Sequence, residues 1–204
     1  MPGLYIYGAG GHAKVIADIA EINQKKILGA VDKNLLRKTL LDKYDVALSL
    51  SELTIDVEDK FIVAVGNNLY RKRIVEEELA NFEFDTLIHP SATISNYAEI
   101  GEGTVVMAGT TINVDVQIGN HCIINTNSSI DHDCLICDYV HISPNVSLAG
   151  DVMVGEGTHV GIGACVIQGV RIGKNCTIGA GAVIIKDVPD GVTVVGNPGR
   201  ILNK

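Results

Sequence analysis

A six-residue period runs through the second half of the chain and limits its fold more than any other feature. Every sixth residue from Ile88 to Ile184 is Ile, Val or Leu. A second column, four residues after each of these aliphatics, holds only small or medium side chains such as Ala92, Cys134 and Ala182. Neither the 3.6-residue period of a helix nor the two-residue period of a simple strand fits this pattern. A short strand followed by a corner does fit.

Three hexads of this kind close one triangular coil, so the repeat predicts a prism-shaped parallel β-helix. Its aliphatic residues would stack along the core, and backbone amides would bond from coil to coil. Between Ile88 and Ile184 no insertion breaks the period, and the Gly196–Gly199 segment ends it. Glycine directly follows the aliphatic residue six times, where we expect turns with positive φ. These glycines are Gly101, Gly119, Gly155, Gly161, Gly173 and Gly179.

The first half of the chain reads as a small α/β unit. Strand-like and helix-like runs alternate along it, namely 4–7 (strand), 15–22 (helix), 27–31 (strand), 61–65 (strand) and 69–79 (helix). This order predicts a βαβ organisation with right-handed crossovers. We therefore expect a Rossmann-like domain over residues 1–81 and a β-helix domain with a C-terminal tail over residues 82–204.

Composition excludes several classes of protein. With 24 acidic and 16 basic residues, the formal charge of −8 argues against a nucleic-acid partner, which would need a basic face. Apolar runs are too short for a membrane span, and the N-terminal residues lack the pattern of a signal peptide. The five cysteines are an odd number without secretory context, so we expect a reduced, cytoplasmic protein. Cys134 and Cys137 resemble a metal pair, but Cys134 falls in the small core column, and no metal is expected.

A glycine turn follows the first predicted strand. Gly8-x-Gly10-x-x-Ala13, with Asp32 further on, approaches a dinucleotide-binding fingerprint, although a simple tight turn would look the same. Residues 1–81 are too few for two mononucleotide-binding halves, so a single nucleotide-sugar pyrophosphate at the helix N-terminus fits better than NAD. The expected substrate-binding residues are Gly10, Gly11, His12, Asp32, Asn67 and Asn68.

One histidine of the repeat has the neighbours of a general base. His132 is flanked by Asp131 and Asp133, and a carboxylate can hold a histidine in one tautomer and make it more basic. A surface histidine in an acidic turn is the alternative. We favour Asp133 as the partner, with Asp131 left open. Gly150 lies one 18-residue coil after His132, where its N–H could stabilise an oxyanion. His141 shares a column with His159, 18 residues later.

Taken together, the segment from Gly8 to Val15, the α/β unit and the hexads resemble one family over nearly the whole chain. It is the sialic acid O-acetyltransferase-like group of hexapeptide-repeat sugar acyltransferases. Within it, the chain is most similar to N-acetyltransferases of nucleotide-linked 4-amino-4,6-dideoxy sugars. The resemblance implies a left-handed β-helix, acetyl-CoA as acyl donor, His132 as general base, the Gly150 amide at the oxyanion, and His141 near the substrate.

The resemblance also implies a homotrimer with the coenzyme in the cleft between two prisms. Gly161, Gly163 and Gly169 would keep one edge of the prism low for the pantetheine arm, and the Pro198 segment would cap the adenine. Two alternatives stay open: an O-acetyltransferase acting on a sialic acid or another sugar, and a non-catalytic trimer that binds a nucleotide sugar. UDP and dTDP are equally acceptable as the nucleotide.

Overall fold

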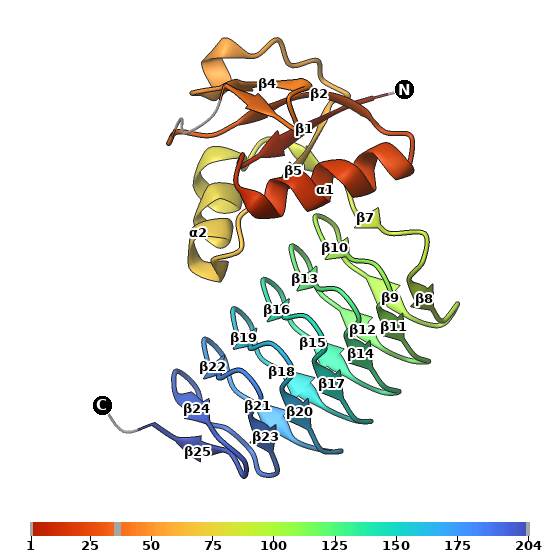
Figure 1. The fold of residues 1–204 in the computed structure, drawn as a ribbon, viewed down its shortest axis with the longest axis vertical. Helices are drawn as coiled ribbons and strands as arrows, with labels where there is room; N and C mark the ends of the chain where they lie inside the picture. Colours follow the sequence, from red (N-terminus) through yellow and green to blue (C-terminus); the bar gives the residue numbers. More distant parts are fainter. Residues whose placement is uncertain (1, 35–37, 203–204) are drawn as a thin grey trace. The chain divides into compact units, whose positions relative to one another are not determined.

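The computed structural model describes residues 2–34 and 38–202 and divides the chain into two compact units, 1–88 and 89–204 (Figure 1). The first unit combines helices with a mixed sheet, and the second is a parallel β-solenoid. The predicted fold class, a small α/β unit followed by a left-handed β-helix of hexapeptide repeats, is confirmed.

The first unit is built on a six-stranded sheet with the order β3-β4-β2-β1-β5-β6. Its strands are β1 (Gly3–Tyr7), β2 (Lys26–Val31), β3 (Thr39–Leu40), β4 (Tyr44–Ala47), β5 (Lys60–Val63) and β6 (Glu83–Phe84). All neighbours pair in parallel except β3, which runs antiparallel to β4. The central strand β1 is completely buried, as its apolar sequence requires.

Two helices follow strands of this sheet, α1 after β1 and α2 after β5. Helix α1 (Gly11–Ile22) buries one face made of Ala13, Ile16, Ala17, Ile19 and Ala20. Helix α2 (Asn68–Arg73) starts at Asn67, whose side chain caps it, and continues as a π-helical turn, η2 (Ile74–Glu78). A short 3₁₀ turn, η1 (Leu50–Glu52), lies between β4 and β5. The predicted run of helix over 69–79 is thus present, but its second part has the wider π geometry.

The first unit extends to residue 88, whereas the sequence analysis ends it at residue 81. Strand β6 accounts for part of the difference, whereas β7 (Leu87–Ile88) belongs to an eight-stranded sheet of the repeat and not to the sheet of the first unit. Strand β6 pairs in parallel with β5 and so adds residues 83–84 to the sheet. Strand β7 is held to the end of α1 by the Asn23 side-chain amide, which donates to the Ile88 carbonyl at 2.9 Å.

The second unit consists of two- and three-residue strands separated by corners. Its strands are β8 (Thr93–Ile94), β9 (Glu99–Ile100), β10 (Val105–Val106), β11 (Thr111–Ile112), β12 (Gln117–Ile118), β13 (Ile123–Ile124), β14 (Ser129–Ile130), β15 (Leu135–Ile136), β16 (His141–Ile142), β17 (Ser147–Leu148), β18 (Met153–Val154), β19 (His159–Val160), β20 (Cys165–Val166), β21 (Arg171–Ile172), β22 (Thr177–Ile178), β23 (Val183–Ile184), β24 (Thr193–Val195) and β25 (Arg200–Ile201). Every third strand stacks in register, as Thr111 on Ser129 and Ser129 on Ser147 show. The strands thereby form three sheets, which are parallel throughout except that β25 pairs antiparallel with β24.

The two columns of the repeat form the core of this unit. From Val106 to Ile184 every sixth residue is at most 4% exposed. The small column is equally buried, and it contains Cys122, Cys134 and Cys176 at 1–2% exposure. Burial raises the pKa of the Cys134 thiol, which disfavours a thiolate nucleophile there. These cysteines therefore serve as small core residues, as the repeat predicts.

The expectation about the six glycines is wrong. Gly119, Gly155 and the others do not have positive φ. The left-handed residues lie two positions later in the hexad, and they include Gly103, Asp133 and Asp151. A Cβ at Gly155 would lie 2.6 Å from the carbonyl carbon of Gly173 in the next coil. These glycines are required because the backbones of successive coils approach each other closely, not because of their own φ.

Candidate active site

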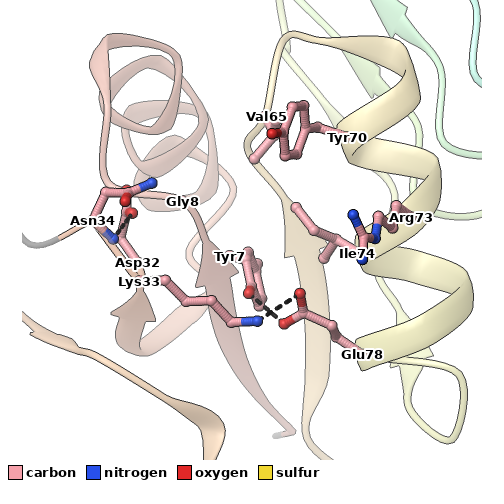
Figure 2. Close-up of a pocket in the computed structure, with 10 residues that line it drawn as sticks. All are labelled: Tyr7, Gly8, Asp32, Lys33, Asn34, Val65, Tyr70, Arg73, Ile74 and Glu78. Carbon is pink, nitrogen blue, oxygen red and sulfur yellow. Dashed lines mark hydrogen bonds and ion pairs between the residues drawn. The ribbon is translucent and has the colours of Figure 1, made fainter.

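A cavity of about 520 Å³ lies in the first unit, where β1, β2 and β5 end (Figure 2). Strands β2 and β5 lie on opposite sides of β1, so the order of the strands reverses direction at β1. In parallel sheets, ligands bind in the crevice at the carboxyl ends of the strands next to such a reversal. The lining residues are Tyr7, Gly8, Asp32, Lys33, Asn34, Val65, Tyr70, Arg73, Ile74 and Glu78.

The glycine turn leads from this cavity into α1: Gly8 is one of the lining residues, whereas Gly10 and Gly11 are not among them. Gly8 has a φ of 113°, and a Cβ there would lie 2.9 Å from the Ala64 carbonyl oxygen, so only glycine fits. Asp32 accepts the Ala9 N–H at 2.9 Å and thereby ties the turn to the end of β2. Around Gly10 and Gly11 there is open space, and no side chain caps the first N–H groups of α1. This arrangement suits an anion.

Of three other predicted binding residues, Asn67 and Asn68 form hydrogen bonds within the protein, and the Nε2 atom of His12 is buried and unpaired among the described residues. Asn67 caps α2 by accepting the Tyr70 N–H at 2.9 Å. Asn68 accepts the guanidinium of the buried Arg71 at 2.8 Å. His12 is largely buried, and desolvation together with the Arg71 charge lowers its pKa to about 4. None of the three predicted residues is among the residues that line the cavity.

Sequence reasoning missed the polar network at the cavity wall. Glu78 accepts the Tyr7 hydroxyl at 2.5 Å and the Lys33 ammonium at 2.8 Å, as Figure 2 shows. Burial opposes ionisation of Glu78, but these two hydrogen bonds outweigh it and lower its pKa. Burial and the Glu78 carboxylate raise the pKa of Tyr7. The four-residue spacing of Tyr70, Ile74 and Glu78 is the sequence signal that would have revealed this wall.

The second unit presents His132 at the corner after β14, with its side chain 55% exposed. Its Nδ1 lies 2.7 Å from Oδ2 of Asp133. Asp133 has a φ of 61°, and this left-handed backbone is what turns its side chain toward the preceding residue. Of the two neighbouring carboxylates, Asp133 and not Asp131 binds the ring of His132. The Asp133 hydrogen bond, followed by the Asp131 charge, raises the pKa of His132.

Gly150 lies against the imidazole of His132. A Cβ built on Gly150 would be 2.6 Å from Nε2 and 3.0 Å from Nδ1 of His132. Within the described part of the chain, no acceptor takes the Gly150 N–H. The structure therefore brings His132 and Gly150 together, so that the imidazole and the Gly150 N–H lie at the same corner.

The histidine column lies on another face of the solenoid. The imidazoles of His141 and His159 stack with their centroids 4.8 Å apart and an interplanar angle of 18°. His141 Nε2 pairs with the Asn125 amide at 3.2 Å, and His159 Nε2 pairs with the Ser143 hydroxyl at 2.8 Å. In both pairs, the histidine Nε2 forms a hydrogen bond with a polar side chain of the preceding coil.

The glycines predicted to border the coenzyme differ in structure. A Cβ at Gly161 would lie 2.6 Å from the Ile178 carbonyl oxygen, so close stacking of coils explains it. Gly163 and Gly169 are left-handed corner residues with φ of 67° and 74°. Open space surrounds Gly163, and only Asp151 comes near Gly169. Pro198 follows a cis peptide bond between β24 and β25.

The described residues offer neither a metal site nor a membrane-spanning helix. Among residues 2–34 and 38–202, no group of three or more His, Cys, Asp or Glu side chains is arranged to hold a metal ion. Within the same ranges, no helix combines the length and apolar character that a membrane crossing requires.

Comparison with family models places both units. The model of the PglD N-terminal domain matches residues 3–77. The model described as bacterial transferase hexapeptide (six repeats) matches residues 115–150 and 151–186. A curated relative, UDP-N-acetylbacillosamine N-acetyltransferase of Bacillus subtilis (strain 168), is 45% identical over 115 residues. That alignment covers 53% of this chain and 52% of the relative, so the chain matches about half of its length.

Solved structures resemble the chain over its full length. The acetyltransferase domain of PglB from Neisseria gonorrhoeae FA1090 is 38% identical, covers 99% of this chain and 100% of that one, and has a TM-score of 0.92. A mutant of perosamine N-acetyltransferase from Caulobacter crescentus, in complex with CoA and GDP-perosamine, is 36% identical with a TM-score of 0.92. The matched region is 100% of this chain and 98% of that one.

The solenoid fold and the matched hexapeptide model define a hexapeptide-repeat transferase. The chain belongs to the family of hexapeptide-repeat acetyltransferases that carry a PglD-type N-terminal domain.

Proposed function

We propose that this protein transfers the acetyl group of acetyl-CoA to the 4-amino group of a nucleotide-linked 4-amino-4,6-dideoxy sugar. The observation that carries the proposal is the corner at which His132, hydrogen-bonded to Asp133, packs against Gly150. The named relatives support the reaction class. Those from Bacillus subtilis and Caulobacter crescentus are named N-acetyltransferases, and the one from Neisseria gonorrhoeae is named an acetyltransferase domain. Solved structures of the latter two hold CoA or acetyl coenzyme A.

When its ring is neutral, His132 has the tautomer that the proposed base needs. An ionised carboxylate only accepts hydrogen bonds, so Nδ1 of His132 carries the proton that binds Asp133. Nε2 then keeps its lone pair and is the nitrogen that takes a proton from the attacking amine. The raised pKa makes His132 a stronger base, and the neutral ring is present above that pKa.

The Gly150 N–H is the donor proposed for the oxyanion. As the amine nitrogen attacks the thioester carbonyl, the C–N bond forms and charge develops on the carbonyl oxygen, where a fixed N–H stabilises it. Collapse of the tetrahedral intermediate breaks the C–S bond. The coenzyme A thiolate leaves, and the proton held by His132 can neutralise it.

The first unit is assigned to the nucleotide sugar. The uncapped start of α1 at Gly10 and Gly11 suits the pyrophosphate. The cavity beside it has apolar walls at Val65 and Ile74 and polar groups at Asp32, which suit a nucleoside. UDP and dTDP are the proposed nucleotides.

Assembly is part of the proposal. Short prisms expose flat faces. Gly169 lies one coil after Gly150, whose carbonyl accepts its N–H at 3.0 Å, whereas Gly161 and Gly163 lie at a different corner, after β19, so the three glycines do not share the single edge that the sequence predicted. We assign acetyl-CoA to the edge of Gly150 and Gly169, with a second copy of the chain as the opposite wall. The Pro198 segment would cap the adenine. A homotrimer supplies three equal clefts of this kind. Sedimentation at assay concentration tests it, and a fully active monomer would contradict it.

The deciding experiment measures CoA release chromatographically with UDP-, dTDP- and GDP-linked 4-amino-4,6-dideoxy sugars as acceptors. Acetylation of at least one amine is expected, and His132→Ala should lower kcat by about 10²–10⁴-fold without unfolding the protein. A sialic acid serves as the hydroxyl acceptor in parallel. Transfer to the hydroxyl alone would favour the O-acetyltransferase, and no transfer or coenzyme binding would favour a binding protein.

A further inference from the structure

Asp131 stands directly before the base and does not contact its ring. Its Oδ1 accepts the backbone N–H of His132 at 2.8 Å. The same oxygen accepts the side-chain amide of Asn113, from the preceding coil, at 2.8 Å. One carboxylate oxygen thus joins the backbone of the base to the coil before it.

This contact completes a set of restraints on the corner. The Asp133 N–H donates to the Val114 carbonyl at 3.1 Å, and the His132 carbonyl accepts the Asp151 N–H at 2.9 Å. Those two bonds belong to the regular ladder between coils. The link from Asn113 through Asp131 to the His132 N–H is added to the ladder at the coil that carries the base.

The other members of this column do not provide the same link. Ser95 lies 18 residues before Asn113 and accepts the Tyr97 N–H. Ala149 lies 18 residues after Asp131 and has no polar side chain. Among residues 95, 113, 131 and 149, only Asp131 has a carboxylate, and it lies in the coil of His132. This placement favours a role specific to that corner.

We propose that Asp131, braced by Asn113, is a positioning residue that fixes the backbone of His132. The inference rests on the proposed function, since it concerns how the base is held. Asp133 then orients the ring, while Asp131 orients the peptide from which the ring projects. A division of this kind limits the freedom of an exposed side chain that must meet a substrate amine within hydrogen-bond reach.

Charge supports the same role. The Asn113 amide, followed by the His132 N–H, lowers the pKa of Asp131, so it is ionised at neutral pH. The charged groups that face His132 are Asp131 and Asp133 at its own corner and Asp151 from the next coil, where Arg171 pairs with Asp151 at 2.8 Å.

Four variants separate geometry from charge. Asp131→Asn keeps an oxygen for both hydrogen bonds but removes the charge, whereas Asp131→Ala removes both. Asn113→Ala removes only the brace. Ser95→Ala is the matched control in the same column, away from the base. Kinetics with both substrates is combined with NMR titration of the His132 ring, a readout that needs no substrate.

We expect Asp131→Ala to lower kcat about 10-fold or more with little change in either KM, in line with loss of positioning of a base. Asp131→Ala and Asp131→Asn should both lower the pKa of His132, because both remove the same charge. Asp131→Asn should reduce kcat less than Asp131→Ala does, and Asn113→Ala should lower kcat by about 2- to 5-fold. Ser95→Ala should change neither quantity. In a His132→Ala background, Asp131→Ala should have no further effect, because it acts through His132.

An unchanged kcat and an unchanged His132 titration in Asp131→Ala would overturn the inference. So would a further loss of kcat from Asp131→Ala in the His132→Ala background. Failure of the proposed function looks different: the wild-type protein would acetylate no amino sugar, or His132→Ala would remain active. In either case the NMR comparison still decides whether Asp131 holds His132.

Discussion

Gly150 packs so closely on His132 that a single added methyl group would lie 2.6 Å from Nε2 of the imidazole. The φ of Gly150 is not in the left-handed region, so alanine is conformationally permitted there. The need for glycine at this position therefore comes from the neighbouring ring and not from the backbone.

The Gly150→Ala variant should fold and lose activity. The methyl group displaces the His132 ring, which has an exposed side to move into, and it crowds the proposed oxyanion donor. We expect kcat to fall by about 10²-fold or more, as when an oxyanion donor is disturbed. Gly181→Asn is the matched control, because it is a left-handed corner with open space for a side chain. Equal kcat values for Gly150→Ala and the wild type would contradict the assignment.

The pH dependence of kcat/KM should report the raised pKa of His132. A base must be unprotonated, so activity should rise with pH and reach half of its maximum above pH 6.5, the ordinary value. Asp133→Asn removes the main cause of the shift, moves this midpoint downward and lowers kcat by about 10- to 100-fold. Asp115→Asn, at the same left-handed corner position one coil earlier, should change neither. An unchanged midpoint in Asp133→Asn would exclude the pairing in solution.

Substitution at Gly10 should affect the two substrates differently. Nothing lies within 4 Å of a Cβ built there, so Gly10→Val disturbs no packing. The side chain would nevertheless cover the exposed amides at the start of α1, where the pyrophosphate is assigned. We expect KM for the nucleotide sugar to rise about 10-fold, while KM for acetyl-CoA stays nearly constant. A rise confined to acetyl-CoA would reverse the assignment of substrates to units.

The stacking glycines should be the most sensitive positions of the solenoid. In Gly155→Ala the new Cβ would lie 2.6 Å from the Gly173 carbonyl carbon and 2.7 Å from the Lys174 nitrogen, both backbone atoms. We expect a loss of about 1–3 kcal/mol in the free energy of unfolding. Gly181→Asn should lose much less, since asparagine tolerates positive φ. Chemical denaturation measures both, and a larger loss for Gly181→Asn would refute the role given to each class.

His12 should make the protein acid-sensitive. Its folded pKa of about 4 lies below the ordinary 6.5, so the folded state binds fewer protons than the unfolded state between these values. Stability is complete above pH 6.5 and falls as the pH drops toward 4, by up to about 3 kcal/mol from this group. His12→Gln should show a weaker loss between pH 7 and pH 4 in urea denaturation. The same loss in both proteins would show that His12 is not responsible.

The sequence by itself determined the solenoid, because a six-residue period has one physical solution, a strand and a corner repeated around a prism. It also indicated His132 as the proposed base, since a histidine between two acids in the hexads combines a basic ring with groups that can orient it. The 18-residue coil even placed Gly150 beside His132. Each of these inferences needs only local spacing.

Tertiary structure decided how those residues are arranged. Asp131 and Asp133 both flank His132, and the sequence favours Asp133 without excluding Asp131. In the structure the carboxylate of Asp133, a residue with left-handed φ, binds the ring, while Asp131 binds backbone. The cavity wall formed by Tyr7 and Glu78 joins β1 to a turn 71 residues later. Close stacking of the coils likewise explains glycines such as Gly155, which contacts the backbone of the next coil and does not have positive φ. Such contacts join residues that are remote along the chain, and no local pattern records which atoms will meet.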